Sequence, residues 1–64
     1  MESSLDTLPR IGAPATRALA LAGYTTLRQL AGVPRNELAR LHGVGPRALG
    51  ILQEALERHH LSLG

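Results

Sequence analysis

A short turn in the second half of this 64-residue chain restricts its fold more than any other feature. The turn is Gly43-Val44-Gly45-Pro46, and leucine and alanine residues with helical spacing flank it on both sides. Gly43 stands where the preceding helix must end, a position that favours a left-handed residue. Pro46 suits the first position of the next helix, because proline has no amide hydrogen and its φ angle is already helical. The sequence therefore predicts a helix, a tight turn and a second helix over residues 38–52.

The same turn has the features of a backbone that binds anions. Val44 is apolar and lies between two glycines, so we expect it to fill the gap between the helices. Gly45 carries no side chain, so the backbone can approach another molecule closely there. The amides of Gly45, Arg47 and Ala48 would then point outward at the positive end of a helix, an arrangement that binds phosphate. The alternative is a turn that joins two packed helices and binds nothing.

A weaker copy of this pattern lies 33 residues earlier, where Leu8-Pro9-Arg10-Ile11-Gly12 aligns with Leu41-His42-Gly43-Val44-Gly45 and Ala15 with Ala48. Arg10 replaces the first glycine in this copy. A non-glycine residue in a left-handed conformation costs roughly 1 kcal/mol or more, so we expect a less regular first turn. Two copies of a two-helix unit predict a pseudo-symmetric domain in which each unit covers the apolar face of the other.

The composition predicts an all-α fold. Leucine and alanine are abundant, β-branched residues are few, and Tyr24 is the only aromatic residue. Start and stop signals predict five short helices, at residues 4–8, 13 or 14 to 22, 25–31, 34–41 and 46 to about 59. Leu61 and Leu63 can pack against the body. The residues expected to face inward on the helices are Ala15, Ala18, Leu19, Ala22, Leu27, Leu30, Leu38, Leu41, Ala48, Leu49, Leu52, Ala55 and Leu56.

Several classes of protein are excluded or disfavoured by the residues that the chain contains. It has no cysteine, so it forms neither a disulfide nor a thiolate metal site. No apolar run approaches the roughly 20 residues of a membrane span, so we expect no membrane partner. The polar, acidic start of the chain is unlike a signal peptide. We therefore expect a cytoplasmic protein, with association with the nucleoid as a further option.

No group of residues predicts an enzyme. His59 and His60 are adjacent, so on a helix they point about 100° apart and make a poor metal pair. We expect them to be solvated at a fraying helix end. His42 is interpreted as a polar residue that ends a helix, with contact to a phosphate as the alternative. We expect no catalytic residue, metal, cofactor or small-molecule substrate.

The positions of the positive charges are more informative than the net charge of the chain, which is +2. All seven basic residues are arginine, whose flat fork of donors suits phosphate. Arg10, Arg17, Arg40 and Arg47 lie in or beside the two turns, whereas most acidic residues lie toward the ends of the chain. This placement favours an anionic partner near the turns.

The second turn resembles the hairpin of the helix-hairpin-helix family. That pattern is an apolar residue, a spacer, Gly-apolar-Gly and a small residue three places on, here Leu41, Gly43, Val44, Gly45 and Ala48. Two such units joined by a connecting helix form a known five-helix domain, a compact bundle like a SAM domain. The resemblance implies one domain over residues 1–64, with a first unit at about 4–22, a connector at about 25–31, a second unit at about 34–59 and a tail at 60–64.

Within that group the chain looks most like the C-terminal domain of the bacterial RNA polymerase alpha subunit. Such domains bind DNA across the minor groove, largely through backbone phosphates, and also contact transcription factors. The family's hairpin glycine, basic residue and small residue match Gly45, Arg47 and Ala48. Its groove-binding arginine falls on Pro14, and its next polar contact falls on Arg17. We therefore expect no preference for particular A·T-rich elements.

The resemblance implies weak, salt-dependent and non-sequence-specific binding of double-stranded DNA, with a transcription or repair protein as a further partner. The alternative function is a protein-interaction adaptor that keeps the fold without binding DNA. An uninterrupted positive ridge joining the turns would favour DNA, and an exposed apolar patch would favour a protein partner. The expected DNA-binding residues are Arg10, Ile11, Gly12, Ala13, Ala15, Arg17, Gly43, Val44, Gly45, Arg47 and Ala48.

Overall fold

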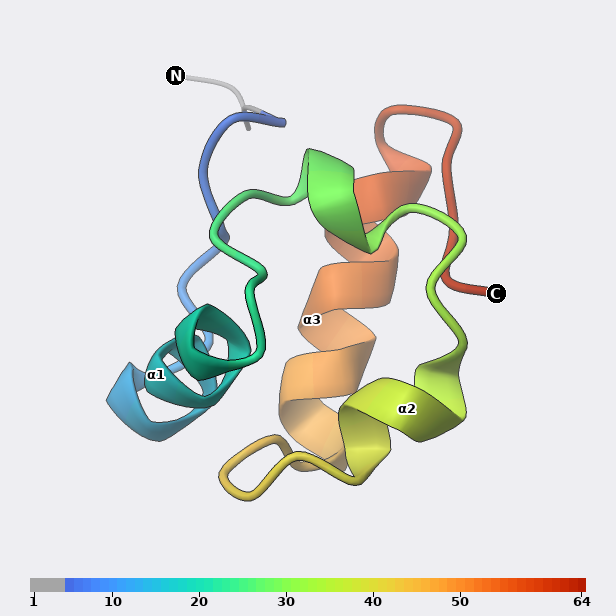
Figure 1. Ribbon diagram of the computed structural model, residues 1–64. Coiled ribbons are helices and arrows are strands. Elements are labelled where there is room, and N and C mark those ends of the chain that lie inside the picture. The colour runs from blue at the N-terminus through green and yellow to red at the C-terminus, as the bar shows by residue number, and fades with distance from the viewer. Residues whose placement is uncertain (1–4) are drawn as a thin grey trace.

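The computed structural model describes residues 5–64, which form helices and loops without any strand. Three α-helices and one short 3-10 helix follow one another along this part of the chain (Figure 1). They are α1 (Ala13–Leu21), η1 (Arg28–Leu30), α2 (Arg35–Ala39) and α3 (Pro46–Glu57). The all-helical class predicted from the sequence is confirmed for these residues.

The number of helices differs from the five predicted. In the described part of segment 4–8, Leu5 and Asp6 form a turn and Thr7 a bend instead of a helix. The carbonyl oxygens of Leu5 and Thr7 accept hydrogen bonds from the amides of Arg28 (2.9 Å) and Leu27 (3.2 Å). Pairing with a distant segment thus replaces a one-turn helix, which is unstable by itself because nucleation is costly.

The other predicted helices are present but shorter. The connector shrinks from residues 25–31 to the three residues of η1, because the backbone of Ala31 turns to an extended ψ of 125°. α2 covers residues 35–39 of the predicted 34–41, and α3 ends at residue 57 instead of about 59. Element ends are the least certain part of any sequence-based prediction, because helix ends fray and tighten.

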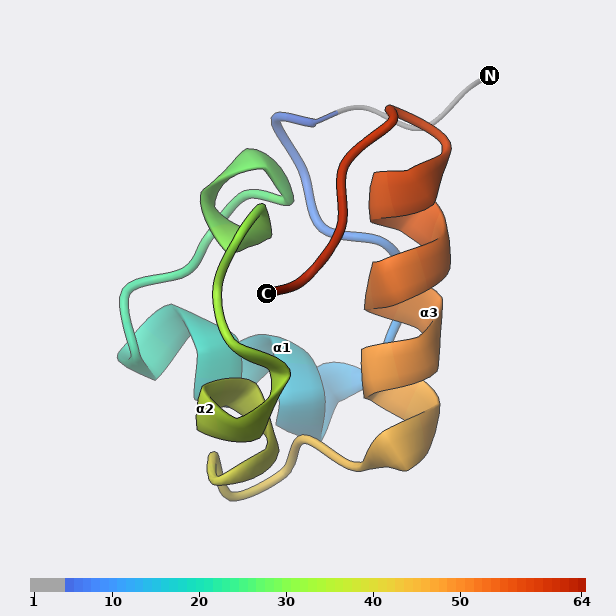
Figure 2. The ribbon, with the colours of Figure 1, turned by 90° about the vertical axis from the view of Figure 1, so that its right-hand side faces the viewer.

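α3 is the longest helix and lies along one side of the molecule, with α1, η1 and α2 on its inner side (Figure 2). All five positions predicted to face inward on α3 are buried. Ala22 was wrongly predicted to be buried; it is exposed because α1 ends one residue before it, and Leu41 is only half-buried. The buried core consists of Ala15, Ala18, Leu19, Leu27, Leu30, Leu38, Val44, Ala48, Leu49, Leu52, Ala55 and Leu56.

The ends of α1 and α3 share one hydrogen-bond pattern but differ in the residue that makes it possible. After α1, the amide of Tyr24 donates to the carbonyl of Leu19 (2.8 Å) and that of Gly23 donates to Ala20 (3.0 Å). Gly23 has a φ of 97°, as this left-handed cap requires. Glycine adopts that angle without strain, because it has no Cβ.

At the end of α3 the left-handed position is occupied by His60, with a φ of 62°. The amides of His60 and Leu61 donate to the carbonyls of Glu57 (3.0 Å) and Leu56 (2.9 Å). The prediction of two solvated histidines at a fraying end was therefore wrong for the fraying and for the half-buried His59, whereas His60 is exposed as predicted. The end is tied by hydrogen bonds, and Nε2 of His59 is buried without a hydrogen-bond partner among the described residues.

The C-terminal segment runs beside the loop between η1 and α2. The amide of Gly32 donates to Ser62 (2.9 Å), and the amide of Gly64 donates to Val33 (2.8 Å). Leu61 and Leu63 are partly buried against the core, as predicted. These contacts hold the end of the chain against the molecule.

Candidate nucleic-acid interface

The second turn has the local geometry expected from its sequence. Gly43 has a φ of 100°, in the left-handed region, and Gly45 is extended with a φ of −107°. Pro46 begins α3, and the side chain of Val44 is 7% exposed. The valine therefore fills the space between the helices, and the glycines leave the outside of the turn without side chains.

The start of α3 presents unpaired amide groups. The amide of Val44 donates to the carbonyl of Leu41 (3.1 Å), and the first hydrogen bond of α3 runs from Leu49 to Gly45 (3.1 Å). Within residues 5–64, the amides of Gly45, Arg47 and Ala48 have no hydrogen-bond acceptor. Pro46 has no amide hydrogen to contribute. Amides at the N-terminus of a 12-residue helix carry partial positive charge and favour an anion.

The first turn differs from the second in the position of its left-handed residue. Arg10 does not adopt a positive φ; the left-handed residue is Gly12, with a φ of 95°. The backbone of the first turn therefore differs from that of the second, and whether it is less regular stays a prediction. The helix nevertheless starts alike, because the amide of Thr16 donates to the carbonyl of Gly12 (3.0 Å). The amides of Ala13 and Ala15 lack an acceptor among the described residues.

The second turn packs directly on the beginning of α1. A Cβ atom added to Gly43 would lie 2.8 Å from the carbonyl oxygen of Pro14 and 3.6 Å from the Cβ of Ala18. The first of these distances is shorter than real Cβ contacts allow. Glycine is thus required at residue 43 for two independent reasons, its φ angle and its close contact with α1.

The arginines beside the turns are exposed and carry uncompensated charge. Arg10, Arg17 and Arg47 are all exposed, and none of them forms an ion pair with a described residue. The ion pair found in the described part of the chain joins Arg28 to Asp6 at 3.5 Å. No acidic side chain within residues 5–64 forms an ion pair with the arginines near the turns, so their charge is available to a partner.

The predicted site residues divide by what they can offer. The side chains of Ala15, Val44 and Ala48 are buried, so these residues can offer only backbone atoms. Ile11 is half-buried and packs against the core. The remaining predicted residues are exposed, apart from the half-buried Gly45.

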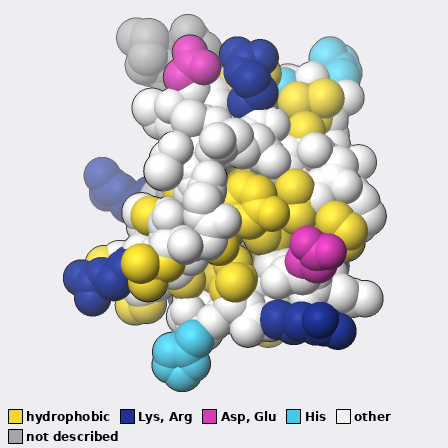
Figure 3. All heavy atoms as spheres, viewed as in Figure 1, with side chains coloured by type: hydrophobic (Ala, Val, Ile, Leu, Met, Phe, Trp, Pro, Cys, Tyr) yellow, Lys and Arg dark blue, Asp and Glu magenta, His cyan; other side chains and the backbone are white. Residues whose placement is uncertain are grey.

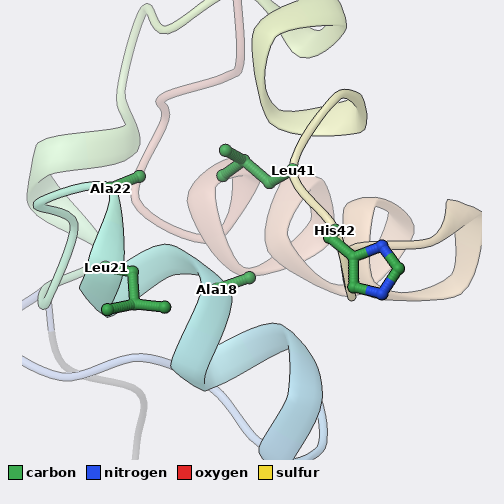
Figure 4. Close-up of a pocket in the computed structure, with 5 residues that line it drawn as sticks. All are labelled: Ala18, Leu21, Ala22, Leu41 and His42. Carbon is green, nitrogen blue, oxygen red and sulfur yellow. The ribbon is translucent and has the colours of Figure 1, made fainter.

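The sequence analysis missed an apolar groove next to the turns. Its walls are Ala18 and Leu21 of α1, Ala22 directly after that helix, and Leu41 and His42 of the segment after α2 (Figure 4). Leu21 is 84% exposed. The sequence offered one signal of this groove. Leu21 lies outside the inward-facing stripe of α1, so its side chain cannot reach the core.

Other kinds of site were sought in the described part of the chain. No group of three or more His, Cys, Asp or Glu residues there could hold a metal ion. None of the described helices combines the length and apolar character needed to cross a membrane. Comparison with protein-family models, curated proteins and solved structures gives no match to this chain.

Proposed function

We propose that this chain is a double-hairpin domain that binds double-stranded DNA without sequence preference, similar to tandem helix-hairpin-helix domains. The observation that supports this most is the set of unpaired amides of Gly45, Arg47 and Ala48 at the start of α3. They lie beside the uncompensated charge of the Arg47 side chain. A phosphate group bound there would accept hydrogen bonds from the amides and be neutralised by the guanidinium.

The first turn would supply a second phosphate contact. Ala13 and Ala15 offer unpaired amides at the start of α1, and Arg10 and Arg17 add positive charge. Contact between Gly43 and Pro14 keeps the two turns close together. Phosphate contacts of this kind position a protein on DNA and carry no sequence information, which agrees with binding that lacks sequence preference.

The expected binding is weak and sensitive to salt. If about three phosphates are neutralised, the logarithm of the binding constant falls with the logarithm of salt concentration at a slope of roughly −2.7. This corresponds to about a fortyfold loss of affinity between 50 and 200 mM salt. A dissociation constant of roughly micromolar or weaker follows, so useful occupancy requires attachment to another binding module or partner.

The proposal is tested by titrating a fluorescein-labelled DNA duplex with the protein at several salt concentrations. We expect Arg47→Glu to weaken binding at least about tenfold and to reduce the salt slope by about 1. Arg58→Glu is the matched control, because it makes the same charge change at the opposite end of α3. Equal losses in the two variants, or binding that does not depend on salt, would contradict the proposed interface.

The proposed biological setting follows from this activity. A weakly binding, cytoplasmic and nucleoid-associated domain would act as an accessory to a transcription or repair protein. The adaptor alternative is favoured by one specific observation, the exposed Leu21 at the groove beside α1.

A further inference from the structure

The groove beside α1 is an apolar feature of the described surface that the DNA interface does not explain. Ala22 and Leu41 point toward one another from opposite walls, and the side chain of Ala18 points toward the side on which His42 lies (Figure 4). Leu21 stands at the groove and is 84% exposed. An exposed leucine alone needs no explanation, but a leucine that lines an apolar depression indicates a binding surface.

The groove extends over two cavities that share part of their lining. It consists of two adjoining cavities of about 270 Å³ each, which share Ala18, Leu21 and His42. The second cavity continues toward Pro14, Arg17 and Gly43. A closed cavity of about 150 Å³ accommodates a benzene molecule, so each open cavity can receive one large apolar side chain. Side chains four residues apart on a helix have the spacing to enter adjoining cavities.

The charges at the groove indicate the chemistry of its partner. Arg17 and His42 line it, and none of the residues that line the two cavities is acidic. Figure 3 shows one face of the molecule on which hydrophobic side chains gather in the middle, with basic and acidic side chains around them. A partner with negative charge would therefore complement the groove. Such charge complementarity speeds association and disfavours basic partners.

We propose that this groove docks an acidic peptide segment that presents two apolar side chains one helical turn apart. The segment would insert its apolar side chains over Ala18 and Leu41, and its carboxylates would face Arg17 and His42. Recognition of a short amphipathic helix in a groove is a common mode of peptide binding. This inference goes beyond the proposed DNA binding and uses a different surface, although Arg17 and Gly43 border both.

Two other occupants fit the groove less well. A second copy of the chain would need to bury roughly 1,200–2,000 Å² for a stable dimer, far more than two small cavities offer. DNA would gain little, because the walls formed by Ala18, Leu21, Ala22 and Leu41 offer no side-chain donor to a phosphate. A short acidic segment of a protein partner matches both the size and the charge of the groove.

The test uses the whole chain and a labelled synthetic peptide in which two leucines, four positions apart, are flanked by glutamates. Fluorescence anisotropy measures binding, and NMR amide shifts locate it. We expect saturable binding with shifts at Ala18, Leu21 and His42. Leu21→Ser should weaken binding severalfold, because it removes the most exposed large apolar side chain at the groove. Ala20→Ser is the matched control, because Ala20 is exposed on α1 and does not line the groove.

Several results would overturn the proposal. A peptide with lysines in place of the glutamates that binds as tightly would exclude recognition of an acidic segment. Unchanged binding to Leu21→Ser, or no shifts at millimolar peptide, would exclude the groove. Self-association in sedimentation that Leu21→Ser abolishes would assign the groove to a second copy. Duplex titration of Leu21→Ser separates the two proposals, because this variant should bind DNA as the unmodified chain does.

Discussion

Each of the two turns of this molecule leads into an α-helix, but the left-handed glycine stands at a different position in each. The second turn is left-handed at Gly43, two residues before the N-cap glycine of α3, whereas the first is left-handed at its N-cap, Gly12. Alignment of the two copies places Arg10 on Gly43, yet Arg10 does not take the left-handed angle. The left-handed conformation is found instead at a glycine two positions further along the chain, which adopts it without strain.

The turns also differ in how tightly the rest of the molecule surrounds them. A Cβ on Gly12 would meet only Cδ of Pro14, at 3.9 Å, which is an ordinary contact. A Cβ on Gly43 would overlap the carbonyl of Pro14 at 2.8 Å. The second turn is thus held by its tertiary contact as well as by its backbone angle, and the first turn by its angle alone.

The largest effect is expected from Gly43→Ala. The added Cβ imposes the left-handed strain of about 1–2 kcal/mol and also collides with the backbone of α1. We expect the free energy of unfolding to fall by at least about 2 kcal/mol, a large share of the stability of a small domain. Denaturation by urea, followed by circular dichroism, measures this change. A loss smaller than that of Gly12→Ala would show that the two turns are not constrained as described.

Gly12→Ala should have an intermediate effect. Only the positive φ opposes the new side chain, so the expected loss of stability is about 1 kcal/mol. The same urea titration measures it. A loss as large as that of Gly43→Ala would mean that contact with Pro14 contributes nothing to the difference between the turns.

His60→Gly should change stability in the opposite direction. α1 ends with a left-handed glycine and α3 with a left-handed histidine, so glycine at residue 60 relieves strain. Glycine also makes the unfolded chain more flexible, which offsets part of the gain. We expect a net stabilisation of about 0.5 kcal/mol, seen as a higher melting temperature. A lower melting temperature would indicate that the half-buried side chain of its neighbour His59 depends on the present cap.

Gly45→Ala should leave stability nearly unchanged and act on binding instead. A Cβ there meets nothing within 4 Å, and the φ of −107° suits any residue. We expect a change of less than about 0.5 kcal/mol in unfolding and a severalfold loss of affinity for duplex DNA, because the methyl group stands between the amides and a phosphate. Gly50→Ala, also in open space but along α3, is the control. Full affinity in Gly45→Ala would remove this turn from the interface.

Much of the second unit could be predicted from the sequence. Gly43, Val44 and Pro46 each have the conformation or burial that their side-chain chemistry requires, and the spacing of leucine and alanine on α3 identified its buried face. These features depend on interactions within a few residues. The unpaired amides of the turn follow from the same local geometry, so that part of the candidate site was also predictable.

The rest depended on contacts between distant segments. Leu5 and Thr7 form no helix because their carbonyls pair with Arg28 and Leu27. The groove at Leu21 could not be foreseen, because it exists only where α1 meets the segment after α2. Neither the hydrogen bonds of Leu5 and Thr7 nor the groove at Leu21 is encoded in a local sequence pattern.

Residue chemistry and spacing alone therefore established an all-helical chain with a glycine turn before its longest helix, because those properties arise within single turns of the backbone. The packing of the helices decided the rest. It determined which carbonyls accept hydrogen bonds from distant amides, why Gly43 tolerates no side chain, and where apolar surface stays uncovered. Packing sets distances between residues far apart in the sequence, and a one-dimensional pattern of side chains does not contain those distances.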